Sequence, residues 1–355
     1  MKKNNQNKSL ILTILALVIL VVTSGVYISK NQEGTFSFNT TAIEDESVPD
    51  VSEEVYIGLL QYTAHPSLDA ISQGIIDTLA DNGYVDGETI TLDFQNGQGD
   101  QSNLSTMANR FVANQADLMI GIATPAAMSL SNASVDIPVL LGAVTDPEHV
   151  GLVESNETPG GNVTGVSDMT PIAQQLDLIR QLQDDAKTLG ILYSSSEDNS
   201  ILQGERAEEL ADDYGFETVT RTVSSTNDVV QVTQQLVAET DAIWIPNDNT
   251  VASAFPSVLE VSNAAKVPVY PAVDMMVAQG GLATLGLNQY KIGVKTGEMA
   301  VEFLNGNIDP SVESVRFAEE TDLVINYETA ELLGIAIPES LSAEAIDSTE
   351  LTEEE

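Results

Sequence analysis

Short apolar runs alternate with amphipathic stretches along the chain from residue 55 onward. The first run, VYIGLLQY at 55–62, predicts a β-strand, and the stretch after it predicts a helix with a C-cap at Gly83. The apolar positions of this helix recur at helical spacing: Leu68, Ile71, Ile75, Ile76 and Leu79. The same pattern predicts nine more strands, at 89–95, 116–123, 137–144, 162–167, 188–194, 218–223, 241–246, 267–272 and 281–287.

The predicted strands fall into two series, each about 120 residues long. Strands that alternate with helices of about ten or more residues form parallel sheets through right-handed βαβ units. The sequence therefore predicts an α/β protein with two Rossmann-like lobes, each built around a parallel sheet.

Polar residues gather directly after the predicted strands, where ligands bind in open parallel sheets. After the first series stand Tyr62, Thr63, Thr124, Thr145 and Asp146, and a helix is predicted to open at Thr124, Pro125 and Ala126. After the second series stand residues 194–200, which include Ser195, Asn199 and Ser200, and then Asn247, Asp248, Asn249 and Asp274. Two rims of hydroxyls and carboxylates that face each other across a cleft predict the capture of a small zwitterion.

The chemistry of these side chains suggests how the zwitterion is divided between the lobes. An ammonium needs hydrogen-bond acceptors, so we expect Asp248 or Asp274 to bind it, with Asp146 as the alternative from the first lobe. A carboxylate is best served by hydroxyls and helix N-termini, so we expect Thr124 and the helix start that follows it to bind the carboxylate.

Aromatic side chains and a histidine add to this picture. Tyr62 and Tyr290 stand at junctions and are candidates for stacking on a ligand, whereas Trp244 and Tyr193 lie within strands and are expected in the core. His65 precedes a proline and is expected to make a turn or cap contact, with contact to a ligand as the alternative. Each polar candidate has an ordinary alternative, because Asp, Asn, Ser and Thr are also the common N-cap and turn residues.

Composition excludes several classes of function. The chain has 54 acidic and 13 basic residues and a formal charge of −41, which repels nucleic acid and anionic lipid. It has no cysteine and only two histidines, and it contains no Walker A, G-x-G-x-x-G, G-x-S-x-G or HExxH motif. We therefore expect no metal, no cofactor and no enzyme activity.

The first 30 residues predict a membrane anchor. Three lysines precede an uncharged run of 19 residues, from Leu10 to Ile28, which as a helix is about 28 Å long, close to the hydrocarbon thickness. No convincing cleavage site follows, so we favour a retained single-pass anchor over a cleaved signal peptide. The flanking lysines predict a cytoplasmic N-terminus and an extracellular body. Residues 31–53 are expected to be an acidic linker, and residues 342–355 a disordered acidic tail.

The motifs after these strands resemble one family, the ABC-transporter substrate-binding proteins of the tryptophan-importer type. In the first series they are YTAHPSLD at 62–69, IATPAA at 122–127, AVTDP at 143–147 and PGGNVTG at 159–165. In the second they are LY at 192–193 with Glu197, Asn199 and Ser200, IPNDN at 245–249, and GGLA at 280–283. The resemblance covers the chain from about residue 55 to residue 338.

This resemblance implies a type I periplasmic-binding-protein fold, in which two lobes joined by three crossing strands close on a ligand. The first lobe would comprise 54–167 and 289–308, and the second 168–288 and 309–341. The implied function is capture of an L-amino acid, tryptophan or another aromatic, for an ABC permease with a separate ATPase. A membrane-anchored sensor of the same fold is the alternative, and the lack of a kinase or second membrane segment in the sequence favours transport.

Overall fold

The structure, a computed structural model, describes residues 55–318 and 320–352. These residues lie within one compact unit, Glu53–Glu355. The predicted anchor at 10–28 and the predicted linker at 31–53 lie outside the described residues. Within the described ranges, no helix is long and apolar enough to cross a membrane.

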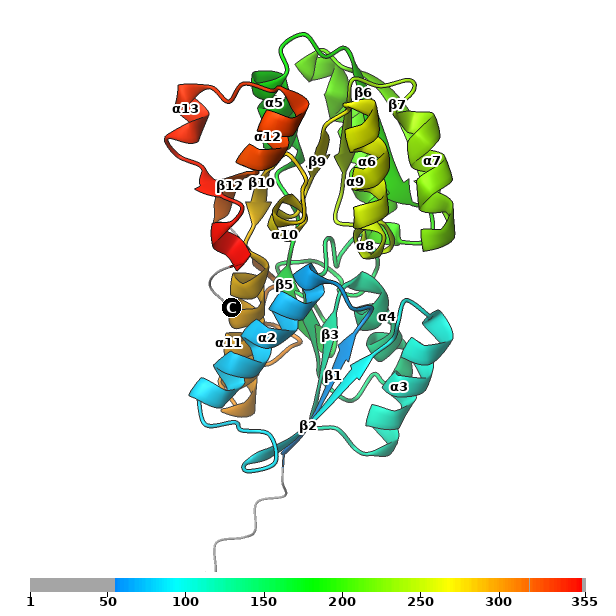
Figure 1. The fold of residues 1–355 in the computed structure, drawn as a ribbon. Helices are drawn as coiled ribbons and strands as arrows, with labels where there is room; N and C mark the ends of the chain where they lie inside the picture. Colours follow the sequence, from blue (N-terminus) through cyan, green and yellow to red (C-terminus); the bar gives the residue numbers. More distant parts are fainter. Residues whose placement is uncertain (1–54, 319, 353–355) are drawn as a thin grey trace, which may run out of the picture. The chain divides into compact units, whose positions relative to one another are not determined.

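The first lobe is built around a six-stranded parallel sheet with the strand order β11-β5-β4-β3-β1-β2 (Figure 1). Its strands are β1 (Val55–Gln61), β2 (Ile90–Asn96), β3 (Leu118–Ile122), β4 (Val139–Gly142), β5 (Val163–Ser167) and β11 (Arg316–Phe317). Its helices are α2 (Pro66–Asp81), α3 (Gln101–Ala113), α4 (Thr124–Ala133) and α11 (Gln289–Leu304). One continuous apolar core joins this sheet to its helices.

The second lobe contains two smaller sheets. A parallel sheet has the order β7-β6-β8-β9, with β6 (Thr188–Ser194), β7 (Glu217–Val223), β8 (Ala242–Ile245) and β9 (Val269–Pro271). A second sheet has the order β10-β12-β13, with β10 (Ala283–Leu287), β12 (Thr321–Ile325) and β13 (Ile346–Asp347). The helices are α5 (Ile172–Leu182), α6 (Asp198–Ala211), α7 (Val229–Leu236), α8 (Asn249–Ser253), α9 (Phe255–Ala265), α10 (Asp274–Ala278), α12 (Tyr327–Leu333) and α13 (Glu339–Ser342).

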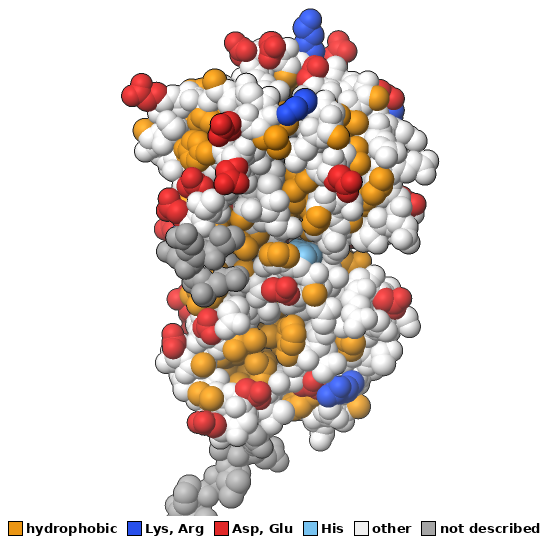
Figure 2. Space-filling model, viewed as in Figure 1, with side chains coloured by type: hydrophobic (Ala, Val, Ile, Leu, Met, Phe, Trp, Pro, Cys, Tyr) orange, Lys and Arg blue, Asp and Glu red, His pale blue; other side chains and the backbone are white. Residues whose placement is uncertain are grey.

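All ten predicted strands are confirmed, and α4 begins at Thr124 as expected. The last strand of the second series differs in its pairing, because β10 runs antiparallel to β12 in a separate sheet. Trp244 and Tyr193 are buried in the second-lobe core, as predicted, and the indole Nε1 of Trp244 donates to Gln175 Oε1 at 3.1 Å. The surface visible in Figure 2 carries many more acidic than basic side chains, in keeping with the charge of −41.

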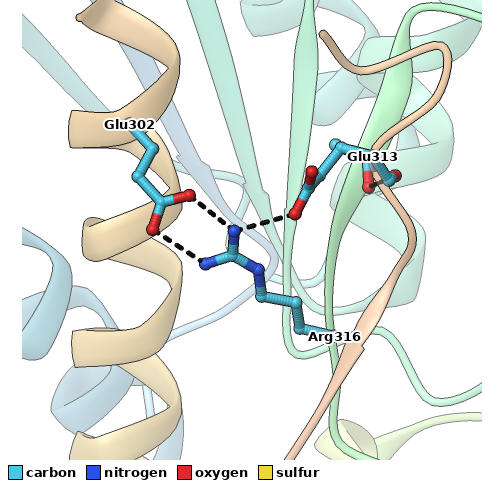
Figure 3. Close-up of polar contacts among 4 residues, drawn as sticks. Glu302, Glu313 and Arg316 are labelled. Carbon is cyan, nitrogen blue, oxygen red and sulfur yellow. Dashed lines mark hydrogen bonds and ion pairs between the residues drawn. The ribbon is translucent and has the colours of Figure 1, made fainter. Parts of the chain in front are cut away.

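The chain passes between the lobes three times: after β5, after β10 and after β11. The third passage follows Phe317, whereas we expected the first lobe to end at residue 308. The extra strand β11 pairs with β5 in the first sheet. Arg316 of β11 donates to both carboxylate oxygens of Glu302 on α11 and to Glu313 (Figure 3), and these ion pairs hold β11 against the first lobe.

The segment expected to be a disordered tail is largely folded. Ile346 and Asp347 form β13, which pairs in parallel with β12, and the N–H of Ser348 donates to Ile325 O at 3.0 Å. Ser348 is buried. The prediction of disorder from the acidic composition was therefore wrong for this segment, because a short strand adds to the edge of a sheet. Of this segment, residues 353–355 lie outside the described range.

Helices α2 and α11 of the first lobe pack with their backbones in close approach. Glycines allow this contact, because a Cβ on Gly293 would lie 2.1 Å from Ile71 O and a Cβ on Gly74 would lie 2.4 Å from Tyr290 O. Both helices begin at the lobe junction, so their contact fixes the positions of the residues at their N-termini.

We expect Gly293→Ala to lower the free energy of unfolding by about 2 kcal/mol or more, because two helix backbones would have to separate to admit one methyl group. Urea denaturation of the variant measures this effect. Gly161→Ala is the control, since a Cβ at Gly161 meets nothing within 4 Å. Equal stability of the two variants would contradict the close backbone packing.

Candidate ligand-binding site

A cavity of about 30 Å³ lies where the carboxyl ends of strands from both lobes meet. From the first lobe it is lined by the residues that open α2 and α11: His65, Ser67, Leu68 and Gln289. From the second lobe it is lined by residues that follow β8 and β9: Asn247, Asp248, Asn249, Ala252, Val273 and Met276. Asp168, the first residue after β5, completes the lining at a passage between the lobes.

A histidine and an asparagine make a direct contact between the lobes. His65 Nε2 lies 3.2 Å from Asn249 Oδ1. The amide nitrogen of Asn249 donates to the buried carboxylate of Glu197 at 2.6 Å, so its oxygen is the atom that faces the histidine. His65 Nε2 must therefore carry the hydrogen of this bond. Burial lowers the pKa of His65, against the raising effect of Asn249 and Asp69, which favours a neutral ring with Nδ1 as an acceptor.

Asn247 and Asp168 are held together at the other side of the cavity. The amide nitrogen of Asn247 donates to the backbone oxygen of Asp168 at 3.1 Å and to its Oδ2 at 3.0 Å. Asn199 and Ser200 of α6 both donate to the backbone oxygen of Asn247 and hold it in place. Burial raises the pKa of Asp168 to about 6, although Thr145 and Asn247 act in the opposite direction.

Several buried polar atoms in this cavity have no hydrogen-bond partner. Among the described residues, nine buried side-chain nitrogen or oxygen atoms are unpaired, and four of them belong to residues that line the cavity. These four are His65 Nδ1, Ser67 Oγ, Asp168 Oδ1 and Asn247 Oδ1. Buried polar groups are paired in the great majority of cases, so such a concentration marks a place where a ligand supplies the partners.

Three of the polar residues predicted after the second-lobe strands line the cavity, namely Asn247, Asp248 and Asn249. Asp248 is the N-cap of α8, and its two carboxylate oxygens accept the N–H groups of Val251 and Ser194. Burial, followed by the nearby charge of Glu197, raises the pKa of Asp248 to about 7. Asp248 therefore acts as a helix cap, which was the alternative to ligand binding for the polar candidates. Asn199 and Ser200 support Asn247 without lining the cavity themselves.

Tyr62 and Thr145 lie close to the cavity but do not line it. Burial, and after it the charges of Glu197 and Asp248, raise the pKa of Tyr62 to about 12, so this tyrosine of the first lobe faces the second. Thr145 is buried next to Asp168, and its backbone oxygen accepts the Ser167 hydroxyl at 2.8 Å.

Other predicted residues lie away from this cavity and make local contacts. Asp146 Oδ1 accepts the N–H of His149 in a turn, and the Ser195 hydroxyl donates to Val223 O. Tyr290 is 42% exposed and donates to Asp77 on α2. The residues of the α4 start and its neighbourhood, Thr63, Thr124, Pro125 and Ala126, are likewise absent from the lining.

Asp274 is buried at the start of α10, and its Oδ1 accepts the N–H of Met275 at 2.7 Å. It does not line the cavity. Burial is the main cause that raises its pKa to about 7, and the charge of Asp322 adds to the effect. Asp274 thus serves the backbone at the start of α10 and lies beside the N–H of Gln289 at the start of α11, but it does not itself line the cavity.

The sequence analysis did not select Asp168 or Gln289, and for His65 it favoured a turn or cap contact over a contact with the ligand. Asp168 follows a predicted strand directly, so the rule that selected the other candidates also applies to it. The backbone of His65 is the N-cap of α2, as expected, but its side chain crosses to the second lobe. No pattern within the first lobe indicates that contact, because it depends on how two distant segments meet.

Two α/β lobes that meet at a cavity lined by polar groups from both sides are the arrangement of a solute-binding protein. The sequence matches the family described as ABC transporter substrate binding protein over residues 56–349. It is 37% identical to the tyrosine-binding protein of Clostridioides difficile (strain R20291) over 307 residues, which are 86% of this chain and 88% of that protein. The chain belongs to the ABC transporter substrate-binding protein family.

Solved structures extend the comparison. An ABC domain from Streptococcus pneumonia in complex with L-Trp is 46% identical, with a TM-score of 0.80 over 83% of this chain and 99% of that one. A ligand-free, open structure of a substrate-binding protein with adhesive properties from Clostridium difficile is 38% identical, with a TM-score of 0.65 over 82% and 98%. The predicted type I periplasmic-binding-protein fold and the resemblance to the tryptophan-importer type are confirmed.

We expect Asp274 to make stability depend on pH. Its carboxyl stays protonated in the folded state up to about pH 7, while the unfolded chain ionises near pH 3.8, so its contribution to stability falls as pH rises between these values. Asp274→Asn should therefore raise Tm relative to the wild type by about 2–4 °C or more at pH 8, and by much less at pH 4. Thermal unfolding across this range measures the difference.

Asp241→Asn is a control for which the expected change in stability has the opposite sign. The carboxylate of Asp241 accepts the N–H groups of Lys187 and Thr188, and these bonds hold its pKa below the usual value. This variant should lose stability at neutral pH and approach the wild type in acid. A difference for Asp274→Asn that does not change with pH would show that the Asp274 carboxyl is not perturbed by burial.

Proposed function

We propose that this chain is the extracytoplasmic binding protein of an ABC importer and that it captures an aromatic L-amino acid between its lobes. The delivery of this ligand to a membrane permease driven by a separate ATPase is part of the proposal. The tyrosine-binding relative and the L-Trp complex support the ligand class. The observation that carries the proposal is the inter-lobe cavity, where unpaired polar atoms lie beside an apolar wall.

The apolar wall suits an aromatic side chain. It consists of Leu68 from the first lobe and Ala252, Val273 and Met276 from the second, all of them buried. Methionine sulfur makes favourable contacts with aromatic rings, and burial of an aromatic side chain contributes roughly 2–3 kcal/mol by area.

Ligand entry requires the lobes to move apart. The cavity of about 30 Å³ is far smaller than the roughly 300–1,000 Å³ of typical small-molecule pockets. The three passages between the lobes are the natural hinge, and hinge closure is a common response of this architecture. Opening would break the contact between His65 and Asn249, so this hydrogen bond belongs to the closed form.

A thermal-shift screen of the chain from residue 53 onward against the twenty L-amino acids tests the ligand class. We expect Trp, Tyr or Phe to raise Tm by several degrees, since a ligand at 100 times its Kd adds about 2.7 kcal/mol to stability. Stabilisation by branched-chain or polar amino acids alone, with none by the three aromatics, would rule out this identification.

We also propose that the run from residue 10 to residue 28 is retained as a single-pass membrane anchor, with the body on the outer side. The support is its length of 19 uncharged residues and the lack of a convincing cleavage site in the sequence. N-terminal sequencing of the membrane-associated protein should recover the start of the chain. A mature N-terminus between residues 24 and 35 would instead show that the segment is cleaved.

A further inference from the structure

Three of the unpaired atoms in the cavity can only accept a hydrogen bond. Asn247 uses its amide nitrogen on Asp168, which leaves the oxygen Oδ1 unpaired. His65 uses Nε2 as the donor to Asn249, which leaves Nδ1 of a neutral ring as an acceptor. Asp168 Oδ1 is an acceptor whenever its carboxyl is ionised. The missing partner is therefore a donor.

These three acceptors are almost completely withdrawn from water. The exposed fractions are 7% for His65, 7% for Asp168 and 8% for Asn247. They come from three different parts of the fold, since His65 opens α2 in the first lobe, Asn247 follows β8 in the second, and Asp168 stands at the first passage between them. A single group that satisfies all three would connect both lobes and the hinge.

The charge at this position is also unbalanced. None of the residues that line the cavity is a lysine or an arginine, and the ion pairs recorded among residues 55–318 and 320–352 do not include Asp168. A second carboxyl group, that of Asp248, lines the same cavity. A buried carboxylate is costly unless a cation or hydrogen-bond donors accompany it, so the expected partner is cationic.

We propose that Asp168 Oδ1, Asn247 Oδ1 and His65 Nδ1 together bind the primary ammonium group of the ligand and that this group holds the lobes closed. A primary ammonium carries one positive charge and three donors and no acceptor, which matches three acceptors and one carboxylate. The cavity of about 30 Å³ has room for one or two water-sized groups, which is the size of an ammonium. The inference rests on the proposed function and adds that a free α-amino group is required for tight binding.

Calorimetric titration of the full chain with matched ligand pairs tests this assignment. The probes are L-tryptophan with indole-3-propionic acid, and L-tyrosine with 3-(4-hydroxyphenyl)propionic acid, which differ within each pair only by the amino group. We expect the wild type to bind the acid that lacks the amino group at least 100-fold more weakly. Asp168→Asn should weaken binding of the amino acid by at least about 30-fold, as expected when one side of a buried charged pair is removed.

The effect of removing the ligand's amino group and the effect of Asp168→Asn should also be coupled. Asp168→Asn should leave the affinity for the acid without the amino group within about threefold, because that ligand never used the carboxylate. Asp146→Asn is the matched control, since this carboxylate also follows a first-lobe strand but caps a turn outside the cavity. It should bind the amino acids as the wild type does.

The outcomes separate the two proposals. If the wild type binds none of L-tryptophan, L-tyrosine and L-phenylalanine, the proposed function fails. If it binds the amino acid and the matching acid within about threefold of each other, the function stands and the ammonium site is wrong. Equal weakening of both ligands by Asp168→Asn would also overturn the site, and the wild-type comparison decides the question even if that variant does not fold.

Discussion

Parallel strands place all of their carboxyl ends at one edge of a sheet, and this constraint determines where the functional residues of the protein lie. In the first lobe, that edge supplies His65, Ser67 and Asp168, and in the second it supplies Asn247, Asp248 and Asn249. Because the two edges share one small cavity, residues almost 200 positions apart in the sequence come within hydrogen-bond distance, as His65 and Asn249 do with a separation of 184.

The second-lobe side of this cavity is rigid because its buried charges serve the backbone. Glu197 accepts four hydrogen bonds, from the backbone and side-chain nitrogen of Asn249 and from the N–H and hydroxyl of Thr250. Asp248 accepts two N–H groups and caps α8. Satisfied polar networks of this kind stabilise a unique geometry. Against this fixed frame, the free oxygen of Asp168 and the unpaired histidine nitrogen stand out as atoms left for a ligand.

The fold was predictable to a large extent because hydrophobic periodicity is a local property, and it located all ten strands of the two series and the start of α4 at Thr124. The site was predictable only as a region. Asp274 and Tyr290 satisfied the same positional rule as Asn249, yet Asp274 lies outside the cavity and Tyr290 bonds to Asp77. The packing of one lobe against the other decides which of these junction residues line the shared cavity. The hydrophobic and polar pattern within one lobe does not determine that packing. The strand β11 was not predicted, because its two residues are too few to show a hydrophobic periodicity.

The late return of the chain to the first lobe has a consequence for how the molecule is made. The edge strand β11 completes the first sheet next to β5, and the Thr164 hydroxyl donates to Glu313 O across a separation of 149 residues. During synthesis from the N-terminus, the edge of the first sheet at β5 therefore stays incomplete until β6–β10 of the second lobe and α11 have been synthesised. Exposed edges are prone to pairing with other chains, and long-range pairings form slowly. The first sheet can therefore reach its final, six-stranded form only late in synthesis.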